Sequence, residues 1–435
     1  MNASPDRAPL RVGIAGLGTV GAGTFKLLAG NADQLRARCG REIVVTAVSA
    51  RDQSKDRGID IDGIQWCDDA LSLAKLDSVD VVAELIGGSD GIAKSLAETA
   101  IANGKHVVTA NKALLAHHGA TLARAAEAAG VSLAYEAAVA GGIPIVKAMR
   151  EGLAGNRISR VYGILNGTCN YILSAMRESG REFEDVLAEA QSLGYAEADP
   201  AFDIDGVDAA HKLAILTSLA FGCEVQFDAV HVEGIRSVSP LDIRFAEELG
   251  YRIKLLGIAG RTDHGIEQRV HPCMVPISAP IAHIEDVFNA VVADGDYVDT
   301  TMYEGRGAGE GPTSSAVVAD LTDIARGRSV PTFAIPAADL APLEAAPMSS
   351  HVGSYYVRFM VVDRPGVFAE IAGALRDHSV SMEAILQHGR DPGEAVPVVL
   401  TTHETDEASM TATLTAIQKS EAVVETPMLI RIEAL

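Results

Sequence analysis

The chain has 435 residues, enough for about two to four domains, and its 48% hydrophobic and 22% charged content excludes wholesale disorder and a collagen-like chain. Asp and Glu (58) outnumber Lys and Arg (36), and the formal net charge of −22 repels nucleic acid phosphates and anionic membrane surfaces. These values favour a small-molecule substrate, with neither nucleic acid nor membrane as a partner.

The sequence carries no signal for export or membrane insertion. No apolar run approaches the ~20 residues needed to span a bilayer, and the polar N-terminus lacks the basic and apolar regions of a signal peptide. The five cysteines are scattered, without a CxxC pair, so neither a disulfide framework nor a cysteine zinc site is indicated. We expect a cytoplasmic protein.

Short β-rich runs alternate with Ala-rich helical stretches over the first 140 residues. This alternation predicts a Rossmann-like, doubly wound parallel sheet with helices on both faces, in an α/β domain at 1–140. The domain ends near a Gly-Gly-Ile-Pro break at 141–144. The predicted strands are 10–15, 43–48, 79–86, 106–109 and 131–135, and helices are predicted at 24–28, 92–103 and 121–129.

Residues 141–330 predict an α+β domain. A glycine-rich loop at 305–311 precedes Pro312, which is typical of the first turn of a helix. We expect that helix, within 312–330, to pack back on the first domain. The predicted strands are 157–165, 253–259, 268–276, 287–293 and 297–303, and the predicted helices are 168–178, 183–192, 207–221 and 313–326.

A stretch rich in alanine and proline at 331–350 indicates a linker. Beyond it, residues 351–435 predict the order βαββαβ, which is the ferredoxin-like arrangement. The predicted strands are 355–362, 380–387, 396–402 and 428–432, with helices at 367–378 and 407–418.

A GxGxxG motif directly follows the first predicted strand and opens a helix. In that context its glycines, Gly16, Gly18 and Gly21, allow close approach of a dinucleotide pyrophosphate to a helix N-terminus. A glycine-rich packing turn is the alternative reading. After the second strand, Arg51 and Lys55 favour the 2′-phosphate of NADP, whereas Asp52 keeps NAD open. An ordinary solvated loop is the alternative reading of both basic side chains.

Lys112 follows the predicted strand at 106–109. Its place at the carboxyl end of a parallel sheet, where doubly wound folds bind ligands, makes it a candidate site residue. A lysine is more often an ordinary surface residue, so this signal depends on position alone.

The densest chemical cluster is an acidic segment at 197–208 that holds five carboxylates. Such a cluster calls for cations, and Lys212 lies four residues after Asp208 on one face of a predicted helix. A lysine placed in this way can exchange a proton with a carbonyl-derived oxygen. The alternative is a solvated ion pair worth ~0.2–0.5 kcal/mol. We expect His211 to be a satisfied or exposed histidine.

In chain order, four segments resemble homoserine dehydrogenases: the glycine turn at 16–21, Thr-Ala-Asn-Lys at 109–112, the stretch from 194 to Lys212, and the glycine loop at 305–311. The resemblance covers about residues 10–330. The Asp-Arg-Pro-Gly-Val stretch at 363–367 resembles an ACT regulatory domain.

The resemblance implies reversible reduction of L-aspartate 4-semialdehyde to L-homoserine by NAD(P)H, in threonine, methionine and isoleucine biosynthesis. It implies that Lys212 donates the proton, that Lys112 is a second site cation and that Asp208 is the third catalytic residue. It also implies that 141–330 binds substrate and dimerises. The implied substrate residues are Gly194, Glu197, Asp203 and Asp208. The implied cofactor residues are Gly16, Gly18, Thr19, Val20, Gly21, Arg51, Lys55, Lys112 and Gly309.

The resemblance also implies a sodium-like monovalent cation at Glu136, Val139, Gly141 and Ile143. For the tail it implies an amino-acid effector, threonine by preference, with Asp363, Gly366 and Gln387 as candidate contacts. It further implies a homodimer or homotetramer. The sequence leaves open the cofactor preference, with a lean towards NADP, and the size of the oligomer.

Two other functions fit the same residues. One is a related dehydrogenase acting on another small amino-acid aldehyde or hydroxy acid. The other is a non-catalytic amino-acid sensor built on the same domains. Two lysines among carboxylates, Lys112 and Lys212, argue against the sensor, which would have no use for them.

Overall fold

The computed structural model describes residues 7–388 and 394–435. They form two compact units. The first comprises 1–167, 208–230 and 288–343, and the second 168–207, 231–287 and 344–435. Within the described ranges, no helix has both the length and the apolar character that a bilayer span requires.

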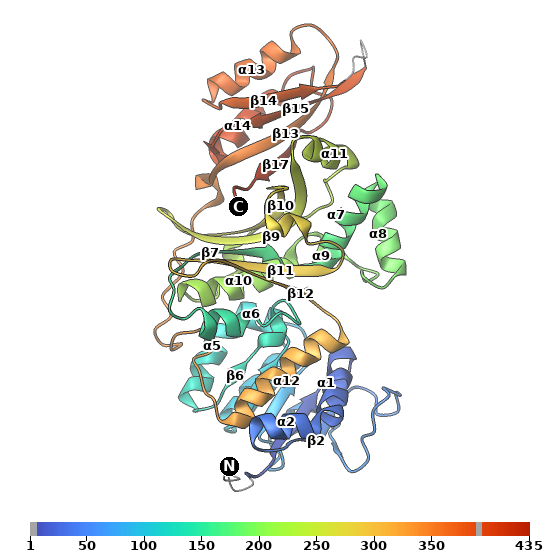
Figure 1. The fold of residues 1–435 in the computed structure, drawn as a ribbon, viewed down its shortest axis with the longest axis vertical. Coiled ribbons are helices and arrows are strands. Elements are labelled where there is room, and N and C mark those ends of the chain that lie inside the picture. The colour runs from blue at the N-terminus through green and yellow to red at the C-terminus, as the bar shows by residue number, and fades with distance from the viewer. Residues whose placement is uncertain (1–6, 389–393) are drawn as a thin grey trace. The chain divides into compact units, whose positions relative to one another are not determined.

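The first unit contains a six-stranded parallel sheet in the order β3-β2-β1-β4-β5-β6 (Figure 1). This is the strand order of a dinucleotide-binding Rossmann sheet, so the predicted fold class is confirmed. The strands are β1 (Leu10–Ala15), β2 (Ile43–Ser49), β3 (Gln65–Trp66), β4 (Val81–Glu84), β5 (His106–Thr109) and β6 (Leu133–Ala134).

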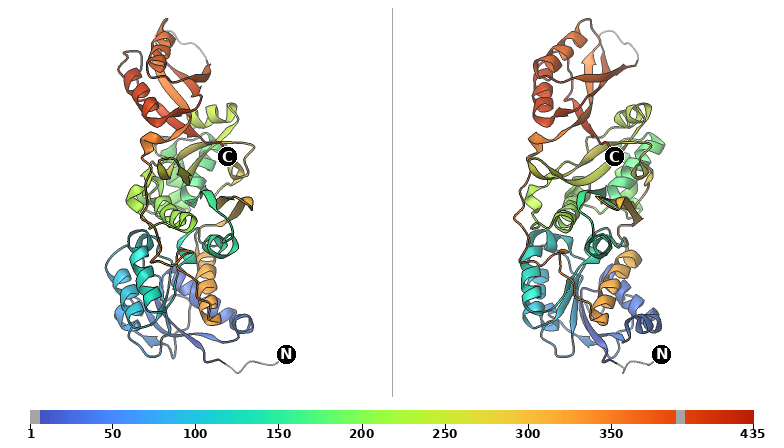
Figure 2. Two further views of the ribbon diagram at one scale, coloured as in Figure 1. Left: turned by 90° about the vertical axis from the view of Figure 1, so that its left-hand side faces the viewer. Right: turned by 60° about the vertical axis from the view of Figure 1, so that its left-hand side comes forward.

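Helices cover both faces of this sheet (Figure 2). One face carries α4 (Ile92–Ala102) and α5 (Lys112–Ala128), and the other carries α1 (Thr19–Gly30), α2 (Ala32–Cys39) and α12 (Glu310–Arg326). Apolar residues of α12 join those of β1 in one buried cluster, so the helix late in the sequence belongs to the core of the first unit. The short helices are α3 (Ala70–Leu73) and α6 (Ile145–Lys147).

Several predicted boundaries differ from the structure. The strand predicted at 79–86 ends at Glu84, because the chain then leaves the sheet in a loop whose Gly87 and Gly88 have positive φ. The strand predicted at 131–135 shrinks to β6. The helix predicted at 121–129 is the end of α5, which starts directly after its N-cap Asn111.

The first unit also holds three antiparallel strands and the helix of the acidic segment. The strands are β7 (Ile158–Ile164), β11 (Phe288–Gly295) and β12 (Asp299–Arg306), and the helix is α10 (Val207–Phe221). Helix α12 begins at Glu310 rather than 313, which leaves Pro312 in its first turn, where a missing N–H costs nothing.

The second unit is built on an antiparallel pair, β9 (Tyr251–Thr262) and β10 (Gly265–Pro276). The C-terminal strand β17 (Met428–Ile432) runs parallel to β10 and antiparallel to β13 (Val352–Val362). One strand therefore belongs to both parts of this unit. The remaining elements here are α7 (Gly167–Ser179), α8 (Phe183–Ser192), α9 (Ala201–Ile204), β8 (His231–Val232) and α11 (Pro240–Glu248).

The tail has the predicted βαββαβ order, with sheet order β17-β13-β15-β14. Alternate residues of β13, such as Tyr355 and Phe359, pack under two helices, while Arg358 lies on the opposite side and contacts Asp242 of α11. The added elements are α13 (Val367–Asp377), β14 (Met382–Gln387), β15 (Ala395–Thr402), β16 (Thr405–Asp406) and α14 (Glu407–Ile417).

The stretch predicted as a linker packs on the first unit as far as residue 343. Phe333 is buried against Tyr135, and the carboxylate of Glu127 accepts hydrogen bonds from the backbone N–H groups of Thr332 and Ala337. Residues 332–337 of this stretch are therefore held by contacts within the unit.

Candidate active site

One buried carboxylate in the first unit holds two lysines. Asp208 and Lys212, one turn apart on α10, are paired at 2.7 Å, and Lys112, the first residue of α5, lies 2.5 Å from the other oxygen of Asp208. Asp208 is 2% exposed and Lys212 7%. The structure therefore brings together the three residues that were predicted to be catalytic. Because Asp208 and Lys212 are buried, the alternative of a solvated surface ion pair is excluded.

Two residues at the end of β7 complete this cluster, and the sequence did not single them out. The side-chain amide of Asn166 donates to Asp208 at 2.8 Å, and the ammonium of Lys212 donates to the carbonyl of Leu165 at 2.6 Å. Asn166 is buried, so its amide fixes the carboxylate plane against rotation. No local pattern marks this asparagine, because its partner is 42 residues away.

The electrostatics of the cluster keep its carboxylate ionised. Burial alone would raise the pKa of Asp208, but the charges of Lys212 and Lys112 outweigh burial and hold that pKa well below its usual range. His211 is buried against His117 and Phe227, so of the two expectations for it, a satisfied or an exposed histidine, exposure is excluded. Burial, and then the neighbouring His117, lower the pKa of His211 to about 4.

The glycine turn has the geometry that a dinucleotide needs. A Cβ on Gly16, whose φ is 94°, would lie 2.5 Å from the carbonyl oxygen of Leu85, and one on Gly21 would overlap the carbonyl of Gly16. Nothing lies within 4 Å of a Cβ on Gly18. Thr19 and Val20 then open α1, whose N-cap makes no side-chain hydrogen bond. The turn therefore fits a pyrophosphate at a helix N-terminus.

The loop after β2 carries the candidate phosphate-binding cations. Arg51 and Lys55 are exposed there. The guanidinium of Arg57, which the sequence reading passed over, donates to the carbonyls of Leu17 (3.0 Å), Lys55 (2.7 Å) and Asp52 (2.5 Å). Arg57 thus ties this loop to the glycine turn.

The glycine loop before α12 lies within the same unit. Gly309 is the N-cap of α12 and has a φ of 115°. A Cβ on Gly23 of α1 would lie 2.5 Å from atoms of both Glu310 and Ser314, so α1 and α12 meet at close range there. Lys26 and Glu310 add an ion pair at 2.9 Å between the two helices.

The candidate cation residues form a tight bend at 136–143. Gly141 has a φ of 50°, and both carboxylate oxygens of Glu136 accept backbone N–H groups, from Val146 and from Lys147, each at 2.9 Å. Because the Glu136 side chain is engaged in this way, a cation at the bend would be held by backbone carbonyls. That this bend binds a monovalent cation stays a prediction. The four residues are Glu136, Val139, Gly141 and Ile143.

The other candidate substrate residues belong to the second unit. Gly194, with a φ of 76°, follows the end of α8, and Glu197 is exposed. The carboxylate of Asp203 accepts a hydrogen bond from Thr168 at 3.3 Å. Their role in substrate binding stays a prediction.

The candidate effector residues lie in the tail. Gly366 has a φ of 97° and caps α13, and Asp363 precedes it in the turn that follows β13. Gln387 is the last residue of β14. Residues 389–393, next to Gln387, lie outside the described residues.

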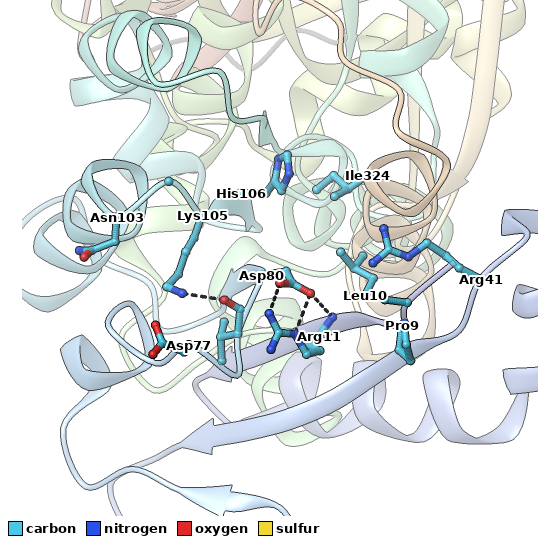
Figure 3. A pocket seen from close by; sticks show the side chains of 13 residues that line it. Pro9, Leu10, Arg11, Arg41, Asp77, Asp80, Asn103, Lys105, His106 and Ile324 are labelled. Carbon is cyan, nitrogen blue, oxygen red and sulfur yellow. Dashed lines mark hydrogen bonds and ion pairs between the residues drawn. The ribbon is translucent and has the colours of Figure 1, made fainter. Parts of the chain in front are cut away.

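Figure 3 shows an open hollow of about 640 Å³ at the opposite edge of the Rossmann sheet. It is lined by residues at the starts of β1, β4 and β5. Arg11 there pairs with Asp80, and the ammonium of Lys105 donates to the carbonyls of Leu76 and Val79, each at 2.6 Å. Because doubly wound folds bind ligands at the carboxyl ends of their strands, this hollow is separate from the candidate active site.

A second cluster of possible metal ligands is occupied by protein groups. The ligand atoms of His271, Cys273 and Glu433 lie within 4.8 Å of one another, but Arg269 donates to His271 at 2.8 Å and also pairs with Glu433. Burial lowers the pKa of His271 and raises that of Cys273, so both are neutral. This arrangement is a hydrogen-bonded core rather than a metal site.

Three family descriptions match the chain. They are homoserine dehydrogenase over residues 144–322, the NAD-binding domain of homoserine dehydrogenase over 16–136, and the ACT domain over 355–422. A homoserine dehydrogenase of Pseudomonas aeruginosa is 46% identical, over 98% of this chain and 99% of the relative, and one of Neisseria gonorrhoeae is 47% identical over the same shares.

Solved structures agree with these relatives. A homoserine dehydrogenase from Thiobacillus denitrificans superposes with a TM-score of 0.92 at 47% identity, covering 98% of each chain. A homoserine dehydrogenase from S. aureus gives a TM-score of 0.77 at 31% identity, covering 98% of this chain and 100% of that one.

Proposed function

The chain belongs to the homoserine dehydrogenase family, an oxidoreductase acting on a CH–OH group with NAD(P), and from that premise we propose how its own residues perform the reaction. The observation that carries the proposal is the single buried carboxylate of Asp208 between Lys112 and Lys212. Its relatives are named homoserine dehydrogenases, and we propose that this chain interconverts L-homoserine and L-aspartate 4-semialdehyde.

Lys212 is the proton donor and acceptor at the substrate oxygen. When bound, NAD(P)H would supply a hydride to the aldehyde carbon, and NAD(P)+ would take it back in the reverse direction. When an aldehyde is reduced, its oxygen gains negative charge, and an ammonium held nearby stabilises that charge before it gives up a proton. Asp208 and the carbonyl of Leu165 fix the direction of the Lys212 ammonium. In the oxidation of homoserine, the same amine receives the hydroxyl proton.

Lys112 adds a second positive charge beside the reacting oxygen and the cofactor. Its position is set by the start of α5, directly at the carboxyl end of β5. Two ammonium groups and one carboxylate leave the cluster with a net positive charge, which favours an alkoxide over a neutral aldehyde oxygen. Glu197 and Asp203 are proposed to bind the amino end of the substrate, and Gly194 to shape the turn before them.

For the cofactor we propose a preference for NADP. The exposed cations Arg51 and Lys55 lie at the end of β2, where the ribose 2′ position of a dinucleotide is read in this fold. The glycine turn at 16–21 and the N-cap Gly309 complete the proposed set.

The remaining assignments rest on the family. We propose a monovalent, sodium-like cation held by backbone carbonyls at the 136–143 bend, and threonine as an effector at Asp363, Gly366 and Gln387. An oligomer is proposed because β12 is an edge strand of its three-stranded group and is preceded by Tyr297, which is 90% exposed. We place the enzyme in the cytoplasm.

Initial rates with homoserine and each of NAD and NADP, with and without millimolar threonine, test these assignments together. The proposal expects oxidation of homoserine, a larger kcat/KM with NADP than with NAD, and a lower rate with threonine. A chain that turns over another small hydroxy acid but not homoserine would refute the substrate. Equal use of both cofactors would refute the NADP preference, and rates unaffected by threonine would refute the effector.

A further inference from the structure

Glu84, the last residue of β4, is completely buried, and both of its carboxylate oxygens accept hydrogen bonds. One oxygen accepts the backbone N–H groups of Ile86 (2.8 Å) and Gly87 (3.2 Å). The other accepts the hydroxyl of Thr109, at the end of the neighbouring strand β5, at 2.6 Å. Burying a carboxylate is costly unless hydrogen bonds compensate for its lost hydration. These three bonds therefore hold in place the first residues of the loop after β4 and the end of β5.

Asn111 makes a second link between the same two loops. Its backbone N–H donates to the hydroxyl of Thr109 at 3.0 Å, and its side-chain amide donates to the carbonyl of Gly88 at 2.7 Å. Its side-chain oxygen accepts the N–H of Leu114 at 3.0 Å and so caps α5. The loop after β4 and the start of α5 are therefore joined by a continuous hydrogen-bonded network.

Each of these loops leads to a part of the proposed machinery. On one side, the N–H of Leu85 donates to Ala15 at 2.8 Å, and the carbonyl of Leu85 abuts Gly16 of the glycine turn. On the other side, the next residue after the cap is Lys112, 2.5 Å from Asp208. Glu84 stands between the cofactor turn and the catalytic lysine.

We propose that Glu84 is a positioning residue that sets Lys112 relative to the cofactor turn, acting through Thr109 and Asn111. The inference rests on the proposed role of Lys112. A carboxylate is needed because all three of its partners are donors. A glutamine has a single acceptor oxygen. If its NH2 group faces the Thr109 hydroxyl, the hydroxyl proton loses its acceptor; if it faces the N–H groups of Ile86 and Gly87, donors meet donors.

The experiment compares steady-state kinetics of Glu84→Gln and Thr109→Val with the wild type. A displaced lysine lowers kcat, and misplacement by about 1 Å costs about a hundredfold. We expect kcat about tenfold to a hundredfold lower in both variants, with KM for homoserine changed much less. Thr109→Ser, which restores the hydroxyl, should recover most of the rate.

Thr322→Val is the matched control, because the Thr322 side chain is also buried and its hydroxyl donates to the carbonyl of Val318 in its own helix α12. It should leave kcat and KM at wild-type values. Unchanged kcat in Glu84→Gln and Thr109→Val would overturn the inference. So would a loss of kcat in Thr109→Val that Thr109→Ser does not recover.

A double-mutant cycle with Lys112→Gln separates this inference from the proposed function. If Glu84 acts through Lys112, adding Glu84→Gln to Lys112→Gln lowers kcat little further. Fully additive losses would overturn the inference. Wild-type rates in Lys112→Gln alone would instead show that the proposed role of Lys112 is wrong.

Discussion

At the residue scale, the proposed chemistry depends on a few positively charged side chains, although the chain as a whole has a net charge of −22. Asp208 collects two of them and is itself oriented by Asn166. A carboxylate in this setting stays ionised through the whole working range of pH, because the pKa of Asp208 is held well below its usual value. The two lysines therefore share a constant negative partner.

Arg51 supplies a prediction on cofactor choice. A guanidinium binds a 2′-phosphate through paired hydrogen bonds, whereas a ribose hydroxyl offers it little. We expect Arg51→Ala to raise KM for NADP about tenfold, roughly the effect of losing 1.4 kcal/mol of binding, with KM for NAD nearly unchanged. Initial rates with each cofactor measure this. An equal change for both cofactors would remove Arg51 from the phosphate site.

His211 supplies a prediction on pH. Burial and then His117 lower its pKa to about 4 from an ordinary value of 6.5, and Lys112 and Lys212 act in the same direction while Asp208 opposes them. The unfolded chain thus binds the proton more readily than the folded one. His211 therefore makes its full contribution to the free energy of unfolding above pH 6.5, and this contribution is lost as the pH falls towards 4. At pH 5 the loss amounts to about 2 kcal/mol.

Urea denaturation of the wild type and His211→Phe at pH 7 and pH 5 measures this contribution. The variant should lose about 2 kcal/mol less than the wild type between the two pH values. The effects of other titrating groups are the same in both proteins and cancel in the comparison. One such group is Glu136: burial and then Asp320 raise its pKa to about 7, so its contribution to the free energy of unfolding is lost as the pH rises. The same pH dependence in both proteins would contradict the assignment.

At the element scale, α1 and α12 are packed closely at Gly23, although they are far apart in sequence. A Cβ at this position would lie 2.5 Å from side-chain atoms of both Glu310 and Ser314 and 3.2 Å from the backbone oxygen of Glu310, so these side chains or α12 itself would have to shift. We expect Gly23→Ala to destabilise the protein by about 1–3 kcal/mol and to raise KM for the cofactor, because Gly309, a proposed cofactor residue, is the N-cap of α12.

Gly30→Ala, on the same helix, is the matched control, since nothing lies within 4 Å of a Cβ there. It should be neutral or stabilising by up to ~1 kcal/mol. Urea denaturation of both variants measures the difference. Equal effects of the two substitutions would show that the helices can separate at no cost.

The sequence predicted those elements well that are marked by a pattern of neighbouring residues. The glycine turn, the strand of residues 10–15 and the pair of Asp208 and Lys212 four residues apart are all short-range features, and the structure has each of them. The predicted strand at 79–86 was too long, because its apolar run continues past Glu84 into a loop.

The residues that the sequence reading missed have distant partners. Asn166 contacts Asp208, Glu84 contacts Thr109, and the C-terminal strand pairs with β10 far away in the chain. Nothing in the spacing around these residues records such contacts, because they are set by how the sheets assemble. Arg57 likewise contacts Leu17, which is 40 residues away, and it bonds there to a backbone carbonyl, which no side-chain pattern marks.

At the scale of the whole molecule, the tail is joined to the rest of the second unit by buried ion pairs along β17. Arg269 of β10 pairs with Glu433, and Arg431 bonds to Glu233 at 2.9 Å and to Glu407 at 2.5 Å. Removing the tail would remove β17 from its place beside β10 and would leave the buried Arg269 without the carboxylate of Glu433. Point substitutions are therefore the better test of the tail than truncation.

The pair of Arg269 and Glu433 supplies a prediction on stability. Both side chains are nearly fully buried, at 5% and 6% exposure, so removing one leaves an uncompensated charge. We expect Arg269→Met to destabilise the protein by about 3–5 kcal/mol. The double variant Arg269→Met, Glu433→Leu should regain most of that loss in denaturation experiments. Additive losses would show that the two residues do not act as a pair.

The proton transfer at Lys212 is the central claim, and one measurement tests it most directly. The rate of homoserine oxidation by Lys212→Met is compared with that of the wild type, with NADPH binding to each followed by fluorescence titration. The account predicts that kcat falls about 10²–10⁴-fold while the Kd for NADPH stays the same. A kcat close to that of the wild type, in a variant that binds NADPH normally, would contradict it.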